Sequence, residues 1–503
     1  MHLFFTFLQR FRYSRVAKRW YGAALNPCLA QAGGKGGTLQ TWKTTVGVAA
    51  GLWLITGGLG RAEDLGDILL KKGVITPEEL RQAKEEEKQK AAAEESRRDS
   101  ILAKLPKWLE MVTLFGDLRL RYEGLYEHNL NANNRERLRG RLGMAVNPAE
   151  EVGMTFRLAT GDPNDPISTN QSFTNTFTRK PFNLDWAYLT VKPGKTFHIE
   201  PGWFTLVGGK FGVNQLYRIT EMMWDDDLAP EGALEIFNLF DHREGFFRSV
   251  KVTGLQWVVD QVSTASDPWV IGGQGVVDMA VDGTANWTVA LADYGYQNLN
   301  EVATKFISST GSSPNSSLAN SNFLAFTNGK ISGFESRFNM ISFTTEFNFV
   351  DPVGLGIPAG IFGDMVYNTQ ARNSQNTGVW VGAGVGNAGR DWYHDVLKNV
   401  GDWGVSYTYV WVQKDATLSL FSYSNFDYQR GYNTGTTQKG STNVMGSILR
   451  LDYMLFPNFQ LTVKSHFINP VDRELATTTQ GVPLTRSGNE TLTRLQVDAL
   501  LKF

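Results

Sequence analysis

Cysteine is nearly absent from this 503-residue sequence, which contains only Cys28. Beyond that position the chain has no thiol, so disulfide bonds, a cysteine nucleophile and a C-x-x-C-H haem attachment site are excluded. Pro27 directly precedes Cys28, and this context argues against a lipoprotein cleavage site. The fold therefore has to close without covalent cross-links.

Long apolar runs are also missing. After residue 62, no segment approaches the roughly 18 apolar residues that a membrane-spanning helix needs. This excludes a helical membrane protein. The mean hydropathy of −0.25 is compatible with a transmembrane β-barrel, in which only alternate residues of each strand need be apolar. The formal net charge of −1 gives no reason to expect nucleic acid as a partner.

Acidic residues are absent from residues 1–62, which carry arginines, lysines and an apolar run from Val46 to Gly58. This pattern predicts a signal peptide that is cleaved after Ala62, and hence export. The basic region is long for a signal peptide, and a start codon near Leu39 would leave one of ordinary length. A signal anchor that is never cleaved is the alternative.

Residues 63–108 are rich in Lys, Glu, Ala and Gln and predict a charged helical segment in the periplasm. Thr76 is expected to cap a helix that begins at Pro77, and Glu79 completes the capping box. The helix has too few apolar residues to belong to a core. A solvated arm, an oligomerising coil and a contact with the cell wall all remain open.

From residue 109 to residue 503 the apolar pattern has a period of two. Leu118 and Leu120, for example, alternate with Asp117, Arg119 and Arg121. Such strands can turn one face to lipid and the other to water. Because an open sheet edge is not stable in hydrocarbon, the pattern predicts an all-β fold, a closed antiparallel transmembrane barrel. The number of segments indicates about 16 strands, with a range of 14 to 18.

Short and long connections alternate along this region, as expected for periplasmic turns and external loops. Short turns are predicted at 148–150, 193–194, 282–283, 351–352, 414–415 and 457–458. Long loops are predicted at 161–180, 298–330, 369–402, 427–442 and 469–489.

The final strand alternates apolar or small residues with polar ones and ends at Phe503. A terminal phenylalanine on such a strand resembles the C-terminal signature of bacterial outer-membrane proteins, which the barrel assembly machinery reads. Phe503 is therefore the predicted assembly signal. Localisation in a bacterial outer membrane follows from the same pattern, with outer-membrane lipid as a partner.

Arginines gather on the predicted inner face of three neighbouring strands. Because adjacent strands lie about 4.8 Å apart, these side chains should form one basic patch. Two interpretations remain open: a field that favours anions in a water-filled pore, and ion pairs with acids such as Asp117 and Glu123 that hold the wall together. The predicted pore-lining residues are Arg119, Arg121, Arg137, Arg139, Arg141 and Arg157.

Asp225, Asp226 and Asp227 lie in a long segment after a predicted strand and are candidate acids of a constriction loop. If that segment folds into the barrel, its carboxylates can face the arginines. A calcium site and a plain solvated loop are the alternatives. The spacing does not match a defined calcium-binding loop, so no metal and no cofactor are expected.

Several stretches resemble the putative porin family of Gram-negative outer-membrane β-barrels. They are Phe115–Glu123, Leu184–Leu189, Gly208–Lys210 and Trp224–Gly232, together with the charged prefix that ends near Trp108. The resemblance implies a barrel with porin-like diffusion and transfers no catalytic residues.

The residues also argue against two other functions. The histidines beyond the leader lack a metal-ligand spacing such as H-E-x-x-H, and no G-x-S-x-G elbow is present, so we expect no enzyme. A sheath around an electron-transfer cytochrome needs a wider bore than about 16 strands gives. We therefore expect a porin for passive diffusion of small hydrophilic solutes and ions, with some anion preference. A substrate-specific uptake channel is the nearest alternative, and a homotrimer is an expectation by analogy.

Overall fold

The computed structural model describes residues 76–78, 81, 82, 85, 106–127, 132–174, 176–242, 244–263, 265–281, 283–307, 320–387, 397–428, 440–472 and 491–503. The chain divides into two compact units, Met1–Arg98 and Asp99–Phe503. In the first unit, Pro77, Glu78, Arg81, Gln82 and Glu85 are helical and exposed, as expected for the helix that begins at Pro77. The predicted signal peptide and most of the predicted periplasmic segment lie outside the described residues.

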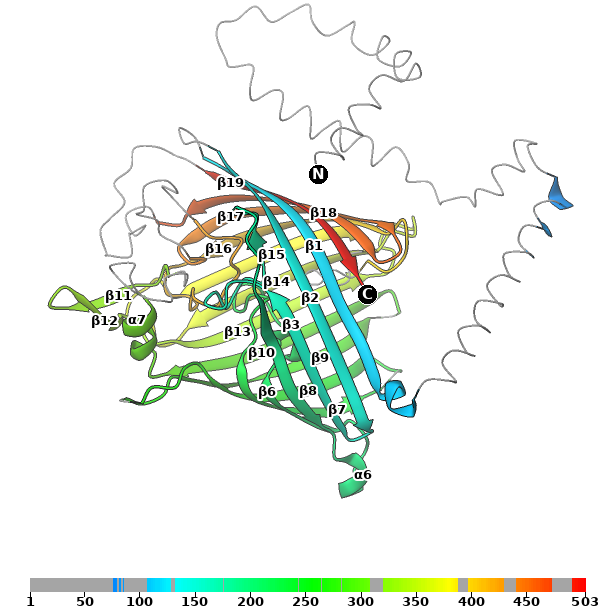
Figure 1. The fold of residues 1–503 in the computed structure, drawn as a ribbon, viewed down its shortest axis with the longest axis horizontal. Helices are drawn as coiled ribbons and strands as arrows, with labels where there is room; N and C mark the ends of the chain where they lie inside the picture. Colours follow the sequence, from blue (N-terminus) through cyan, green and yellow to red (C-terminus); the bar gives the residue numbers. More distant parts are fainter. Residues whose placement is uncertain are drawn as a thin grey trace, which may run out of the picture. The chain divides into compact units, whose positions relative to one another are not determined.

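The second unit is a closed antiparallel barrel of 16 strands (Figure 1). This confirms the predicted fold class and strand number. Consecutive barrel strands pair with each other, and β19 pairs with β1 to close the ring. The strands are β1 (Val112–Tyr126), β2 (Asn133–Ala149), β3 (Val152–Thr160), β5 (Phe182–Val191), β6 (Phe204–Lys210), β7 (Glu231–Asp241), β8 (Phe247–Val258), β9 (Trp269–Val281), β10 (Ala285–Gln297), β13 (Asn339–Phe349), β14 (Ala359–Asn368), β15 (Thr377–Gly386), β16 (Trp403–Val412), β17 (Val444–Phe456), β18 (Phe459–Pro470) and β19 (Leu492–Lys502).

Smaller elements decorate this barrel. The two-residue strand β4 (Gln171–Ser172) pairs with β2, and β11 (Leu324–Thr327) pairs with β12 (Lys330–Phe334) as a separate hairpin. The helical elements are η1 (Lys107–Met111), α6 (Gly194–Phe197), η2 (Val213–Gln215) and α7 (Asn300–Phe306). Among the described residues, no helix is both long and apolar enough to cross a membrane.

The alternating pattern of the sequence places residues on the expected faces. On β1, Leu118 and Leu120 are 47% and 46% exposed on the outer surface, whereas the neighbouring Arg121 is 3% exposed. On β2, Leu142 is exposed and Arg139 is buried. Successive side chains of a strand point to opposite faces, so the arginines lie on the lumen side.

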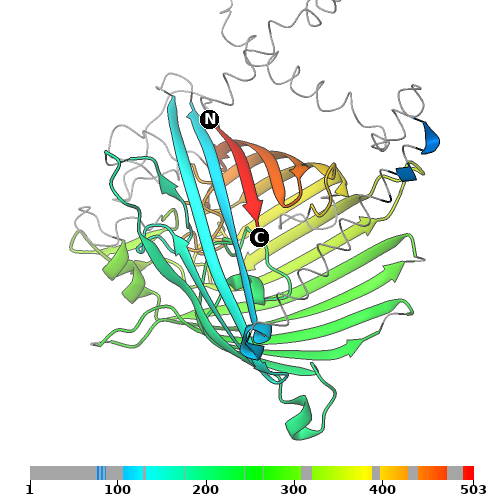
Figure 2. The ribbon, with the colours of Figure 1, turned by 45° about the vertical axis from the view of Figure 1, so that its right-hand side comes forward.

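The two ends of the barrel differ in their connections. We call the end where β1 begins and β19 ends the turn end, and the opposite end the loop end. Figure 2 shows α6 in a connection at the turn end and α7 with the β11–β12 hairpin at the loop end. Most predicted turns and loops fall at the expected end.

Two of the predicted connections are wrong. Residues 414–415 belong to the long connection 413–443 at the loop end, not to a short turn. The predicted loop 369–402 contains the barrel strand β15. The inward positions of β15 are largely glycine, at Gly378, Gly382 and Gly384, so the strand shows no contrast between an apolar and a polar face.

The inside of the barrel also differs along its length. Towards the turn end the inward residues are polar, as predicted, for example Ser249, Thr344 and Thr462. Towards the loop end the inward residues of most strands are apolar and buried, for example Leu255 of β8 and Val410 of β16. On β1 the inward residues near this end, Arg121 and Glu123, are charged. The expectation of a polar inner face is therefore wrong only where long connections fold inward and pack against an apolar part of the barrel wall.

Candidate functional site

The predicted arginines of β1 and β2 lie directly opposite one another in the antiparallel register. Arg119 pairs with Arg139, and Arg121 pairs with Arg137. Like charges in such cross-strand pairs repel and destabilise a sheet unless acids lie between them. We refer to the inward arginines of the two strands as the arginine wall; they are Arg119, Arg121, Arg135, Arg137, Arg139 and Arg141.

Two acids on β1 are each shared by two guanidinium groups of β2. Asp117 accepts from Arg139 Nε at 2.9 Å and from Arg141 Nε at 2.6 Å. Glu123 pairs with Arg135, and Arg137 lies 3.8 Å away. These shared contacts support the interpretation of the arginine wall as a network of ion pairs. Because each acid serves two arginines, the wall has more guanidinium groups than carboxylates.

The closing strand β19 adds a third acid to the wall. Asp498 accepts two hydrogen bonds of 2.6 Å from Arg121, one to each carboxylate oxygen. This fork-to-fork geometry is the strongest form of an arginine–carboxylate pair. Asp498 was not predicted, although its inward position on the last strand and the need for the barrel to close were both visible in the sequence.

Arg157 on β3 stands beside the wall and has its own partners. It pairs with Asp185 of β5, and its guanidinium carbon lies 3.3 Å from the ring centre of Trp186. A planar guanidinium stacks well on an indole ring. Arg157 is therefore a locally neutralised part of the inner face.

The connection 211–230 between β6 and β7 crosses the lumen. On one side, the hydroxyl of Tyr217 donates to Asp278 of β9, and Arg218 pairs with Glu346 of β13. On the other side, Asp227 lies 3.5 Å from Arg141 and 3.7 Å from Arg139 of β2. Since β2 and β13 are opposite strands of the ring, this inward loop spans the barrel.

The three aspartates of this inward loop have different surroundings. Asp227 alone reaches the arginine wall, and it also accepts the Thr169 N–H at 3.1 Å. Asp225 accepts the N–H groups of Ser424 and Asp227, so it fastens the inward loop to the connection 413–443. Asp226 is exposed. Position in the sequence did not distinguish the three.

The ionisation of Asp225 and Asp227 is pushed in opposite directions. Burial and the negative charges of Asp226 and Asp227 raise the pKa of Asp225 well above its ordinary value. Burial also acts to raise the pKa of Asp227, but Arg139, Arg141 and Arg119 outweigh it and hold that pKa below the usual carboxyl range. Asp227 therefore keeps its negative charge at neutral pH.

A cation at the three aspartates is geometrically conceivable, because each offers a carboxylate oxygen within 4.8 Å of the others. The surroundings do not favour it. Asp227 already lies against two guanidinium groups, whose positive charge opposes a second cation. We assign no metal to this cluster.

A second connection, 413–428, folds inward beside the first. Arg494 of β19 pairs with Asp427 and donates to the carbonyl of Ser424 at 3.1 Å. The Tyr423 hydroxyl lies 3.3 Å from His466 Nε2 on β18. The sequence predicted a short turn at 414–415 and an external loop only from residue 427, and these contacts were not predicted, because nothing local marks a loop as inward-facing.

The arginine wall is more enclosed than a water-filled pore would leave it. The side chains of Arg121 and Arg139 are 2% exposed, and those of Arg137 and Arg141 are 12% and 17% exposed. The connection 161–181 covers part of the wall, where Asn170 accepts from Arg119 at 2.8 Å. Contact with solvent is thus limited to parts of a few guanidinium groups.

Asp165 in the same connection makes the stability of this covering loop depend on pH. Burial raises the pKa of Asp165 to about 6, whereas the unfolded chain titrates near about 3.9. The Asp165 carboxyl holds its proton more tightly in the folded state than in the unfolded chain. Its contribution to the free energy of unfolding is therefore complete below about pH 4 and is lost as the pH rises through about 6.

The variant Asp165→Asn mimics the protonated carboxyl. We expect its thermal midpoint to fall less than that of the wild type between about pH 4 and about pH 8. Glu244→Gln, at an exposed carboxyl at the turn end, serves as the control. If the thermal midpoints of Asp165→Asn and the wild type depend equally on pH, the pKa of Asp165 is not raised in the folded protein.

Fold and site together define a closed transmembrane-type barrel whose lumen is narrowed by inward loops and lined by charged groups. Residues 126–328 match the family described as "Putative porin". The match confirms the resemblance seen in the sequence, and it supports an outer-membrane channel.

Solved structures with a similar course of the chain are outer-membrane proteins. OprB of Pseudomonas putida at high pH is 11% identical, with 79% of this chain and 96% of that chain covered and a TM-score of 0.47. OmpF of Salmonella typhi in complex with daunomycin is 10% identical, with 78% and 97% covered and a TM-score of 0.42. The outer-membrane channel DcaP of Acinetobacter baumannii is 11% identical, with 78% and 97% covered and a TM-score of 0.37. No curated protein sequence matches this chain.

Proposed function

We propose that this protein is a passive diffusion channel for small hydrophilic solutes and ions, with a preference for anions. One observation carries the preference: the six guanidinium groups of the arginine wall face four carboxylates, those of Asp117, Glu123, Asp227 and Asp498. The excess positive charge lies where the inward loop narrows the lumen. Charged rings at a constriction set the selectivity of a channel.

The members of the wall contribute unequally to this field. Arg119 donates to the amide oxygen of Asn170 and to no carboxylate among the described residues. Arg137 lies 3.8 Å from a carboxylate that Arg135 contacts more closely. Arginine keeps its charge at any physiological pH. These two side chains are the main source of the proposed anion preference.

The test is the zero-current potential of the refolded mature chain in a planar bilayer under a salt gradient. We expect an anion-favouring current in the wild type and loss of that bias when Arg137, Arg139 and Arg141 are all replaced by Ser. The matched control replaces the same residues by Lys, which retains the charge. A cation-favouring wild type, or a folded and inserted protein that carries no current, would contradict the proposal.

A substrate-specific uptake channel is the second candidate. The observation that favours it is the apolar cluster in the loop-end half, where long connections pack against the barrel wall. Concentration-dependent block of the current by one solute class, and not by others, would distinguish this channel from a general porin.

Export and assembly complete the proposal. We infer cleavage of residues 1–62 as a signal peptide, barrel insertion by the assembly machinery and association as a homotrimer. The proposed assembly signal, Phe503, extends the β19–β1 ladder, with its N–H donating to Gly116 at 3.1 Å and its carbonyl accepting from Gly116 at 3.0 Å. Its ring is 61% exposed and packs over Gly116, so it is accessible to a partner.

A further inference from the structure

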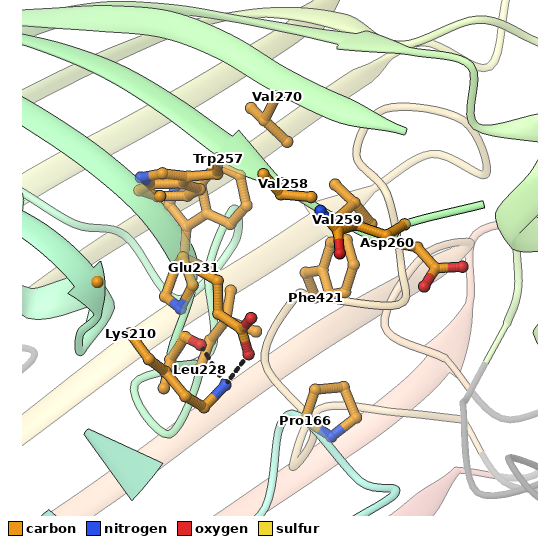
Figure 3. A pocket seen from close by; sticks show the side chains of 16 residues that line it. Pro166, Lys210, Leu228, Glu231, Trp257, Val258, Val259, Asp260, Val270 and Phe421 are labelled. Carbon is orange, nitrogen blue, oxygen red and sulfur yellow. Dashed lines mark hydrogen bonds and ion pairs between the residues drawn. The ribbon is translucent and has the colours of Figure 1, made fainter. Parts of the chain in front are cut away.

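A cavity of about 790 Å³ lies at the loop end, apart from the arginine wall (Figure 3). Its volume falls in the range of about 300–1,000 Å³ that is typical of small-molecule sites. Four strands and four connections supply its lining, among them Lys210, Glu231, Trp257, Leu228, Pro166 and Phe421. In Figure 3, Phe421 and Pro166 lie across the cavity from Glu231 and Leu228.

Aromatic side chains form a preorganised wall of this cavity. The ring of Trp224 packs edge-on against Trp257, with 5.1 Å between ring centres, and against Tyr294 at 5.4 Å. Phe421 stacks on Tyr296 at 6.4 Å. Rings that are held by their neighbours can accept a flat apolar body at little cost in conformational entropy.

The polar groups of the lining present acceptors more than donors. The Lys210 ammonium donates to Glu231 and to the carbonyl of Ala229, both at 3.0 Å. Its side chain is 32% exposed, whereas that of Glu231 is 65% exposed. The accessible half of this pair is therefore a carboxylate.

A second carboxylate lines the same cavity. Asp260 belongs to the lining, and its partner Lys305 does not. The two are paired at 2.6 Å, and the Lys305 side chain is 50% exposed. Two acids and one ammonium thus line the cavity itself, and the second ammonium, that of Lys305, binds Asp260 from outside the lining.

The cavity and the arginine wall lie on opposite sides of one stretch of the inward loop. Asp227 contacts the arginines of β2, and the next residue, Leu228, lines the cavity. A cation in the cavity is separated from the guanidinium groups by this stretch and its negative Asp227.

We propose that the cavity is a binding site for organic ammonium ions that carry a flat apolar body. The aromatic wall contacts the body, and Glu231 with Asp260 faces the ammonium group. Cations are attracted to aromatic faces as well as to carboxylates. Binding at this site does not require that the barrel conducts ions.

Calorimetry on the folded full chain in detergent tests the proposal, with 2-phenylethylammonium as the probe. We expect saturable binding of this cation and much weaker binding of phenylacetate, which has a similar ring and the opposite charge. Phe421→Ala and Glu231→Gln should each weaken binding by about three- to tenfold.

Two matched controls lie at the turn end. Glu150→Gln changes another exposed Glu–Lys pair, with Lys195, and Phe246→Ala removes another exposed ring. Both should leave binding unchanged. The proposal is overturned if phenylacetate or methyl glucoside binds as tightly as the cation, if both lining variants that fold retain wild-type affinity, or if the folded wild type binds no cation. Since no current is measured, the result is separate from the test of conduction.

Discussion

Replacing Asp227 by Asn is expected to raise the anion-to-cation permeability ratio by about twofold and to lower the free energy of unfolding by about 3 kcal/mol. Asp227 is the one acid that the inward loop presents to Arg139 and Arg141. Its loss leaves six guanidinium groups facing three carboxylates and removes the charge that fastens the loop. The zero-current potential and the thermal unfolding of the barrel measure the two effects.

The neighbouring residue provides the matched control. Asp226→Asn removes the same charge from the same triplet, but Asp226 is exposed and, among the described residues, forms no ion pair with the arginine wall. We expect the free energy of unfolding of this variant to change by less than about 0.5 kcal/mol. If the two variants behave alike, the inward loop is not held by Asp227 and the position of the constriction is wrong.

The second large effect on stability is expected at the seam where β19 pairs with β1 and closes the barrel. Arg121 on β1 and Asp498 on β19 form a buried pair across the seam, with side chains 2% and 7% exposed. Asp498→Asn leaves the Arg121 charge buried without its carboxylate. We expect a loss of about 3–5 kcal/mol in the free energy of unfolding, measured as a lower thermal midpoint.

A double variant separates the charge from the packing at this seam. Arg121→Met combined with Asp498→Leu removes both charges and keeps apolar volume. Because desolvation of a buried pair offsets much of its attraction, we expect this variant to recover most of the lost stability. A double variant as unstable as Asp498→Asn would show that the shape of the pair matters more than its charge balance.

The alternation of the sequence was sufficient to predict the barrel and the inner position of the arginines. On β1 and β2 most large residues at alternate positions are apolar and outward, and the residues between them point inward, so a one-residue error in register would have reversed the two faces. The same reasoning failed at β15. Apart from Trp380, glycines occupy its inward positions, and a residue without a side chain marks neither face.

The acids of the site could be predicted only in part. Asp117 and Glu123 lie on the same inward face as the arginines of β1, and the sequence shows them as partners. Asp498 and Arg218 required knowledge of which strands close the ring and which loop enters it. Among the three consecutive aspartates, only the folded loop distinguishes Asp227 from the exposed Asp226.

By itself, the sequence determined the closed barrel, its approximate strand number, the lipid-facing residues and the arginine wall. These follow from the alternation of apolar and polar residues with a period of two. Each strand shows this alternation in its own sequence, because each strand has one face towards lipid and one towards the lumen. The tertiary structure alone decided that an apolar cluster fills part of the loop-end half, that residues 211–230 cross the lumen and that Asp227 meets the arginines. Loop contacts are made across the barrel between residues far apart in the chain, so no local pattern of side chains encodes them.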